Sequence, residues 1–211
     1  MSLICFKNGS LAREKICNGA GLDWAGFSAA LRDTPPGNGG AIMLPWFEPE
    51  ITPNVQEPGV RRYGLDETDG PANVRAVVEA QMMAMAIHSR WMGVKPESIY
   101  ATGGAACNKE ILQIMAQVFD ADVYQFEVGN SAALGAALRA YHADEKAAGG
   151  SISWEEVIVG FAQPVAESRI SPDPELVALY TELKPVYEAC EEHALGRGED
   201  PQQKREAFAQ R

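Results

Sequence analysis

The chain has 211 residues, of which 46% are hydrophobic and 22% are charged, and these values exclude disorder as the default state. Its formal net charge of -11 argues against a nucleic-acid-binding surface, which needs clustered Lys and Arg. The charge does not exclude a nucleotide, which backbone N–H groups and a metal ion can hold. Because no apolar run approaches the roughly 18 residues of a membrane span and the chain opens without a charged-then-apolar leader, we expect a cytoplasmic protein with no membrane contact.

Residues that often mark an active site are scattered along the chain. The four cysteines form no Cys-x-x-Cys pair and no Cys/His cluster, which indicates reduced and mostly buried thiols. The three histidines have no neighbouring Ser, Cys or carboxylate in a triad or metal-ligand pattern, so we expect structural or solvated side chains. The acidic stretch 66–69 is more typical of a solvated turn than of a metal site. The four cysteines are Cys5, Cys17, Cys107 and Cys190, and the three histidines are His88, His142 and His193.

The first thirty residues predict a short strand followed by two helices. Residues 4–6 are apolar and strand-like, and polar turn chemistry follows them. Ser10 can cap a helix over residues 11–17. A second short helix is expected over residues 23–31, and the Pro35-Pro36-Gly37 sequence that follows is expected to stop it.

The next part of the chain predicts an extended segment, a long connection and the longest helix. Residues 41–47 are apolar and extended, whereas residues 48–63 are interrupted by Pro and Gly. A connection of that length is either a structured functional loop or an exposed one. A helix is expected from near Pro71 to about Met92, with Gly93 as its stop and a broad apolar face that packs in the core.

Residues 98–126 predict a strand, a glycine turn, a helix and a second strand. The strands fall over residues 98–102 and 121–126, and Asn108 is a good N-cap for the helix between them. The pair Gly103-Gly104 leaves room for a ligand against bare backbone, and the following helix presents unpaired N–H groups at the same spot. An ordinary turn whose glycines serve only tight packing explains the same sequence equally well.

The remaining chain predicts helices. The helix over 131–141 carries small residues on one side, which indicates tight packing of that helix on a sheet. Further helices are expected from 153 and over 174–195, with an interruption at Pro185, and the charged end from Gly196 is expected to fray. Strand–helix–strand–helix order predicts a parallel sheet, whose ligands bind beyond the carboxyl ends of the strands, where the glycine turn lies.

Five segments together resemble the xylulokinase branch of the FGGY carbohydrate kinases. They occur in the family's order at compatible spacings, and they are residues 5–18, 49–53, 74–81, 101–113 and 130–137. Most FGGY kinases carry a Gly-Glu-Arg-x-Pro-like segment where this chain has Pro49-Glu-Ile-Thr-Pro53, and this difference favours the xylulokinase branch.

The resemblance implies an α/β fold of the ribonuclease H-like (actin/hexokinase) type. The family has two such domains, with ATP and sugar in the cleft between them, and this chain resembles the second one. We therefore expect a nucleotide-binding domain over 4–147, incomplete at its N-terminus, and a helical C-terminal extension over 148–211. An exposed sheet edge at the missing strands would favour a homodimer.

The resemblance also implies a set of ATP-binding residues. Gly103, Gly104, Ala105 and Asn108 are expected to contact the adenosine, and Trp24 to help enclose the nucleotide. The residues alone explain the glycine turn and Asn108 in the same way. For Trp24 the residues alone favour core packing, and only the resemblance makes a binding role an equally good explanation.

Several parts of the family's machinery have no counterpart in the sequence. The catalytic aspartate of the first domain and both phosphate loops are absent, so we expect no catalytic and no metal-binding residue in this chain. The resemblance implies that the whole enzyme uses ATP and Mg²⁺ to phosphorylate the ketopentose D-xylulose, and that the 211-residue chain alone is inactive. A kinase for another sugar or polyol, or a non-catalytic nucleotide-binding module, remains an alternative.

Overall fold

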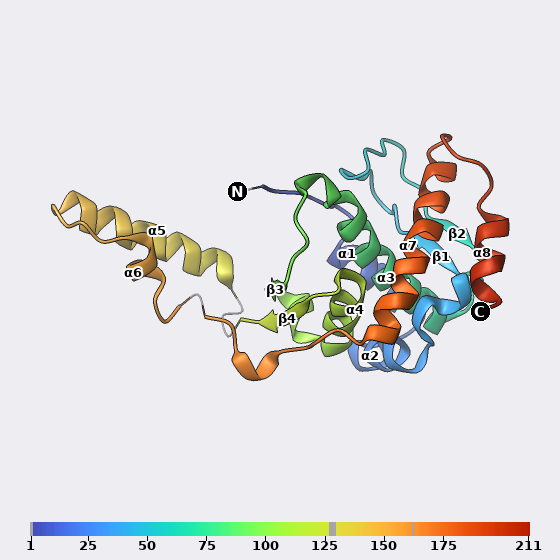
Figure 1. Cartoon of the computed structure of the whole chain (residues 1–211), viewed down its shortest axis with the longest axis horizontal. Coiled ribbons are helices and arrows are strands. Elements are labelled where there is room, and N and C mark those ends of the chain that lie inside the picture. Colours follow the sequence, from blue (N-terminus) through green and yellow to red (C-terminus); the bar gives the residue numbers. More distant parts are fainter. Residues whose placement is uncertain (1, 127–129, 162) are drawn as a thin grey trace.

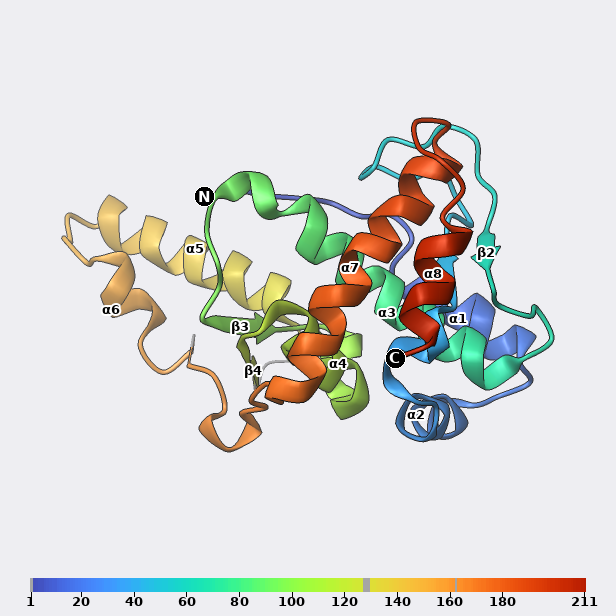
Figure 2. The same cartoon turned by 45° about the vertical axis from the view of Figure 1, so that its right-hand side comes forward.

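The central element of the computed structural model is a long helix, α3, which other helices surround (Figures 1 and 2). The structure describes residues 2–126, 130–161 and 163–211. Its α-helices are α1 (Ser10–Gly19), α2 (Trp24–Asp33), α3 (Gly70–His88), α4 (Lys109–Phe119), α5 (Ser131–Ala147), α6 (Trp154–Ile158), α7 (Pro174–Ala194) and α8 (Gln202–Ala209). Its 3-10 helices are η1 (Pro36–Gly40), η2 (Arg90–Met92), η3 (Gly104–Cys107) and η4 (Ala166–Ser168). Its strands are β1 (Ile42–Leu44), β2 (Arg61–Tyr63), β3 (Ser98–Ala101) and β4 (Asp122–Gln125).

Helix α3 is buried along most of its length because apolar residues occur on all its faces. It packs against α1, α2, α4, α7 and β1. The expected long helix is confirmed, although the α-helix ends at His88 and η2 carries the chain on to Gly93. Gly93 has a left-handed φ of 65°, as a helix-ending glycine requires.

Buried polar side chains join α3 to α7. Oε1 of Glu79 accepts hydrogen bonds from Nε of Arg75 at 2.7 Å, from the Tyr180 hydroxyl at 2.7 Å and from the backbone N–H of Gly37 at 2.9 Å. Nη2 of Arg75 donates to the same hydroxyl at 2.8 Å. Helix α7 therefore shares one core with α3, while the expected boundary between residues 147 and 148 stays a prediction.

The expected strand–helix–strand unit is confirmed. Strands β3 and β4 pair in parallel, with Ser98 opposite Asp122 and Ala101 opposite Gln125, and α4 packs against β4. Strands β1 and β2 form a separate antiparallel pair. The expected strand at residues 4–6 is wrong, because this extended segment pairs with no other strand among the described residues and apolar character alone does not make a sheet.

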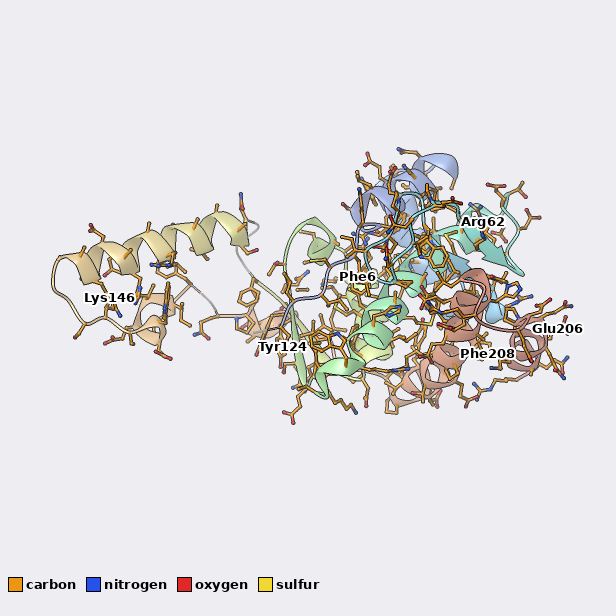
Figure 3. All side chains as sticks on the ribbon, turned by 90° about the horizontal axis from the view of Figure 1, so that it is seen from above. Phe6, Arg62, Tyr124, Lys146, Glu206 and Phe208 are labelled. Carbon is orange, nitrogen blue, oxygen red and sulfur yellow. The ribbon has the colours of Figure 1, made fainter. Side chains whose placement is uncertain are left out.

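Helices α5 and α6 extend away from the rest of the molecule (Figure 1). In Figure 3, Lys146 lies on this arm, far from Phe6 and Phe208 in the main body. The main packing partner of α5 is α6, and a Cβ at Gly135 would meet no atom within 4 Å. The expected packing of the small-residue side of α5 on a sheet is therefore wrong, because no described element covers that side.

Two expectations about the C-terminal part are also wrong. Helix α7 continues through Pro185, and the chain after Gly196 forms α8, which packs against α7 and η1. The ring of Phe208 packs close to Gly37: a Cβ added to Gly37 would lie only 3.2 Å from Cζ of Phe208. Phe208 thus packs on η1, and Arg205 of the same helix hydrogen-bonds to the carbonyl of Gly40. In the part of the chain that the structure describes, no helix has the length and apolar character needed to cross a bilayer.

Candidate functional site

The candidate site is a cavity of about 750 Å³ between α1, α2 and the η3–α4 segment. Four of the five residues expected to bind the nucleotide line it, although they come from two distant parts of the sequence: Trp24, Gly104, Ala105 and Asn108. Gly103 is the fifth and does not line the cavity, but it adjoins Gly104. The cavity lies just beyond the carboxyl end of β3, where ligands of parallel sheets bind.

The two glycines have different reasons to be glycine. Gly103 has φ 85° and ψ -178°, a conformation that is essentially restricted to glycine. Gly104 begins η3 without a positive φ, and a Cβ added there would meet no atom within 4 Å. The turn itself therefore needs Gly103, whereas Gly104 leaves bare backbone at the wall of the cavity.

Asn108 is the N-cap of α4, as its sequence position predicts. Its Oδ1 accepts hydrogen bonds from the backbone N–H groups of Glu110 at 3.0 Å and Ile111 at 3.2 Å. Its Nδ2 donates to Oγ of Ser28 at 2.8 Å, and that hydroxyl donates to the carbonyl of Trp24 at 2.9 Å. The cap thus also links α4 to the first turn of α2.

This cap corrects the expectation that the helix presents its unpaired N–H groups at the glycine turn. A 3-10 helix, η3, separates Gly104 from α4, which begins only at Lys109. Two of the N–H groups in the first turn of α4 are already bonded to Asn108. A ligand at this wall therefore meets mainly the exposed backbone of the glycine turn.

Trp24 does not belong to the core, which removes packing as a sufficient explanation for it. It is the first residue of α2 and is 54% exposed, while its neighbour Phe27 is fully buried. The two rings meet edge to face with centroids 5.3 Å apart, so Phe27 holds one side of the indole. The remaining surface of the Trp24 side chain is available to a ligand in the cavity.

Charged residues that the sequence did not single out also line the cavity. Arg13 projects from α1 and Lys109 from the start of α4, and Glu110 is the lining carboxylate. Oε1 of Glu110 lies 3.9 Å from Nη1 of Arg32. Arg13 is part of the 5–18 segment, but a basic residue on a helix carries no sign of what it faces, so only the tertiary structure reveals it.

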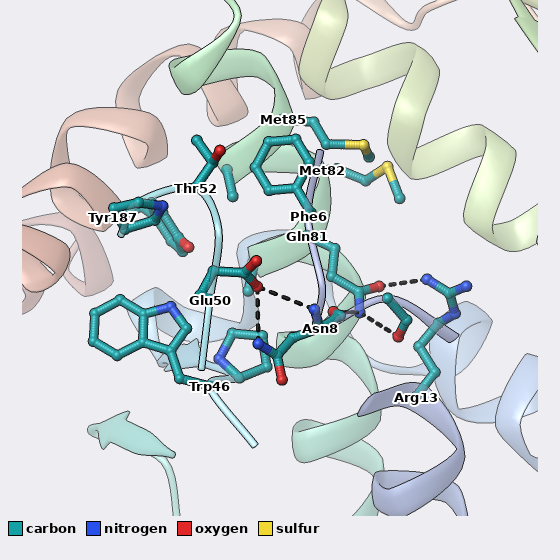
Figure 4. Close-up of a pocket in the computed structure, with 15 residues that line it drawn as sticks. Phe6, Asn8, Arg13, Trp46, Glu50, Thr52, Gln81, Met82, Met85 and Tyr187 are labelled. Atoms are coloured by element: carbon teal, nitrogen blue, oxygen red, sulfur yellow. Dashed lines mark hydrogen bonds between the residues drawn. The ribbon is translucent and has the colours of Figure 1, made fainter. Parts of the chain in front are cut away.

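A second, smaller cavity of about 90 Å³ shares Arg13 with the first, and Glu50 is one of the residues that line it (Figure 4). The carboxylate of Glu50 accepts hydrogen bonds from the N–H groups of Lys7 at 2.6 Å and Ile51 at 2.7 Å, and from the N–H and Nδ2 of Asn8 at 3.1 and 2.9 Å. Burial would raise the pKa of Glu50, but these hydrogen bonds outweigh it and lower the pKa below its ordinary value. Glu50 fastens the start of the 48–63 loop to residues 7–8, and that end of the loop is structured.

The three histidines and Asp66 contact other parts of the chain away from the cavity. Asp66 accepts two hydrogen bonds from Thr68 at 2.8 Å within its turn, as expected of a solvated turn. His88 contacts Glu191 at 2.9 Å, His142 stacks on Trp154 with centroids 4.0 Å apart, and His193 meets the Tyr63 hydroxyl at 3.0 Å. Among the described residues, no three His, Cys, Asp or Glu side chains gather as metal ligands would.

The expectation of mostly buried thiols holds for only two cysteines. Cys17 and Cys190 are buried, whereas Cys5 and Cys107 are exposed. Burial raises the pKa of Cys190 to about 12, so its thiol stays protonated at neutral pH.

Comparisons with known proteins identify the family of this domain. A model of the FGGY family of carbohydrate kinases, C-terminal domain, matches residues 6–143. The xylulose kinase of Rattus norvegicus is 39% identical over 210 residues, which cover 95% of this chain and 38% of that protein. Xylulose kinase 2 of Arabidopsis thaliana is 35% identical over 160 residues, which cover 67% of this chain and 29% of that protein.

Solved structures confirm the expected fold. Ligand-bound xylulose kinase from Lactobacillus acidophilus has a TM-score of 0.76 at 24% identity, covering 90% of this chain and 39% of that one. Plasmodium falciparum glycerol kinase with ADP has a TM-score of 0.62 at 17% identity, covering 89% and 35%. The chain spans about 38% of the length of the rat relative it matches.

Proposed function

The chain belongs to the FGGY family of carbohydrate kinases, and we propose that it forms the adenosine-binding wall of a kinase that phosphorylates D-xylulose with ATP. The observation that carries this proposal is the cavity itself. It brings Trp24 from α2 to the backbone of Gly104 and Ala105 and to the cap residue Asn108. All four residues lie in the domain that the family model matches.

The surfaces around the cavity fit the adenosine part of a nucleotide. The exposed Trp24 side chain offers an aromatic surface for a purine, and stacking of this kind stabilises a base by about 1–3 kcal/mol. The bare backbone at Gly104 permits close approach, since no side chain stands there. The volume of about 750 Å³ lies within the usual range of small-molecule sites.

The cavity does not fit a Mg²⁺ site. Glu110 is its lining carboxylate, and Glu110 lies beside Arg32. Mg²⁺ needs oxygen ligands in octahedral geometry, usually one or two carboxylates together with water and phosphate. We therefore assign no step of the reaction to a metal held in this cavity, and any Mg²⁺ would have its protein ligands outside it.

Binding of adenosine compounds to the 211-residue chain tests the proposal. Calorimetric titration with adenosine, ADP and ATP is expected to show one site. Trp24→Ala removes the stacking surface and is expected to weaken adenosine binding roughly tenfold. Trp91→Ala is the matched control, because Trp91 is also exposed but does not line the cavity. Equal loss of affinity in the two variants, or no saturable binding, would contradict the proposal.

The catalytic part of the proposal needs a phosphotransfer assay. Phosphoryl transfer depends on positioned donors, metal ions and a base around the γ-phosphate. Because the family's catalytic aspartate and both of its phosphate loops have no counterpart in this sequence, the chain alone is expected to form no xylulose 5-phosphate from D-xylulose and ATP. Turnover by the chain alone would refute this. A panel of sugars and polyols tested on an enzyme that includes this domain distinguishes a xylulokinase from another FGGY kinase. Inactivity toward the whole panel would favour a non-catalytic nucleotide-binding module.

We also propose a cytoplasmic location and a homodimer formed through the outer edge of β3. This strand pairs with β4 on one side, and no second strand pairs with it among the described residues. Unpaired N–H and C=O groups along a sheet edge favour pairing with another chain. A light-scattering mass equal to one chain across a concentration series would exclude the dimer.

A further inference from the structure

Arg13 is a cation at the cavity wall without an anionic partner. It lies at the end of the first turn of α1 and lines the cavity together with Ser10. Among the described residues, none of the ion pairs involves Arg13. Arg13 is only partly exposed, and burial lowers the pKa of its guanidinium from the ordinary value. A half-buried charge of this kind is costly unless something compensates it.

Gln81 of α3 holds Arg13 in place. Nη1 of Arg13 donates to Oε1 of Gln81 at 2.6 Å (Figure 4). The amide nitrogen of Gln81 donates to the backbone carbonyls of Asn8 at 2.8 Å and Gly9 at 2.9 Å. These two bonds fix the orientation of the amide, so that its oxygen must face the guanidinium. Gln81 therefore orients Arg13 but, being neutral, leaves its charge uncompensated.

The charge of the cavity is opposite to that of the chain. Arg13 and Lys109 contribute two positive charges to the lining and Glu110 contributes one negative charge, which leaves one net positive charge. In a protein with a net charge of -11, an excess of positive charge in one cavity indicates an anionic ligand. A guanidinium presents several N–H donors in a plane and binds phosphate oxygens well.

We propose that Arg13 binds a phosphate group of the nucleotide, at the α1 wall of the cavity. This inference rests on the adenosine site of the proposed function. The hydrogen bond between Asn108 and Ser28 joins α4 and α2 beside Trp24, and that side of the cavity carries the aromatic surface for the base. The wall formed by Ser10 and Arg13 then remains for the charged end of the ligand.

The test compares ADP with adenosine, which differ by the phosphate groups. Calorimetry on the 211-residue chain is expected to show that wild type binds ADP at least tenfold more tightly than adenosine. Arg13→Gln is expected to remove most of this difference, lowering the ADP affinity roughly 10- to 100-fold with adenosine affinity unchanged. Arg13→Lys keeps the charge and should retain part of the preference. Lys15→Gln is the matched control: it removes one charge from the same helix at a residue outside the cavity.

Each outcome decides between the two proposals or against both. If wild type binds ADP and adenosine equally well, or if Arg13→Gln and Lys15→Gln weaken ADP binding alike, Arg13 does not contact phosphate although the adenosine site stands. If neither compound binds, the proposed function fails together with the inference. Thermal unfolding of each variant shows whether it is folded. Should Arg13→Gln not fold, the loss of ADP affinity in Arg13→Lys relative to Lys15→Gln decides the question, and equal affinities in these two variants would overturn the proposal.

Discussion

Adjacent glycines at the candidate site are expected to respond in opposite directions to the same substitution. Gly103 has φ 85° and ψ -178°, whereas Gly104 has no positive φ and begins η3. A Cβ at either position would meet no atom within 4 Å. Any difference in stability between the two alanine variants therefore comes from backbone conformation and not from a steric clash.

The magnitudes follow from that conformation. Gly103→Ala places an alanine in a region that is essentially restricted to glycine, which costs about 1–3 kcal/mol of the free energy of unfolding. Gly104→Ala introduces no strain and reduces the conformational entropy of the unfolded chain, which raises the free energy of unfolding by about 0.4–1 kcal/mol. The sum gives a gap of roughly 1.4–4 kcal/mol between the two variants. Urea unfolding followed by circular dichroism measures it, provided that both variants share the wild-type m-value.

The same pair separates stability from ligand binding. The methyl group of Gly104→Ala enters the space that the proposed ligand occupies, and overpacking of this kind costs about 1–3 kcal/mol, or roughly 5- to 150-fold in ADP affinity. The variant is thus expected to be more stable and to bind ADP more weakly. A Gly104→Ala protein that binds ADP like wild type, or that loses as much stability as Gly103→Ala, would refute the reasoning.

Three further predictions concern the groups that hold the domain together. Tyr180→Phe removes a hydroxyl bonded to two buried charged groups and should lower the free energy of unfolding in urea by about 2–4 kcal/mol. Tyr187→Phe is the control, because Tyr187 is equally buried on the same helix but makes no hydroxyl hydrogen bond among the described residues. It should change the free energy of unfolding by less than about 0.5 kcal/mol. Asn108→Ala removes both the cap and the hydrogen bond to Ser28, and should lower the free energy of unfolding by about 2 kcal/mol in the same assay. Ser28→Ala removes only the hydrogen bond and should lower it by about 1 kcal/mol. Equal losses would show that the cap contributes little. Because hydrogen bonds lower the pKa of Glu50, the ionised carboxylate stabilises the fold above its ordinary pKa of 4.5, and this stabilisation is lost as the pH falls below that value. Glu50→Gln should therefore flatten the acid side of the plot of unfolding free energy against pH. An unchanged slope would contradict this.

Sequence predicts best those features of this domain that are decided within a few residues. The N-cap at Asn108 depends on local hydrogen bonding and the stop at Gly93 on a left-handed φ, and both are found where the sequence places them, although Gly93 ends the 3-10 helix η2 and α3 already ends at His88. The strand at residues 4–6 and the covered face around Gly135 are different, because each needs a partner that local sequence cannot supply. Helix α8 is the converse case, since Phe208 docks a charged segment that composition alone predicts to be frayed.

The candidate site shows the same division, and it adds a constraint on the ligand. Family resemblance and local pattern found Trp24, Gly104 and Asn108, but Arg13 is brought to the cavity by tertiary packing against Gln81. The structure also limits what Asn108 can do. Its Oδ1 already caps two N–H groups of α4 and one amide hydrogen is bonded to Ser28. An amide nitrogen has two hydrogens, so Asn108 has one donor left for a ligand and can recognise only an acceptor atom, such as a ring nitrogen or a ribose oxygen.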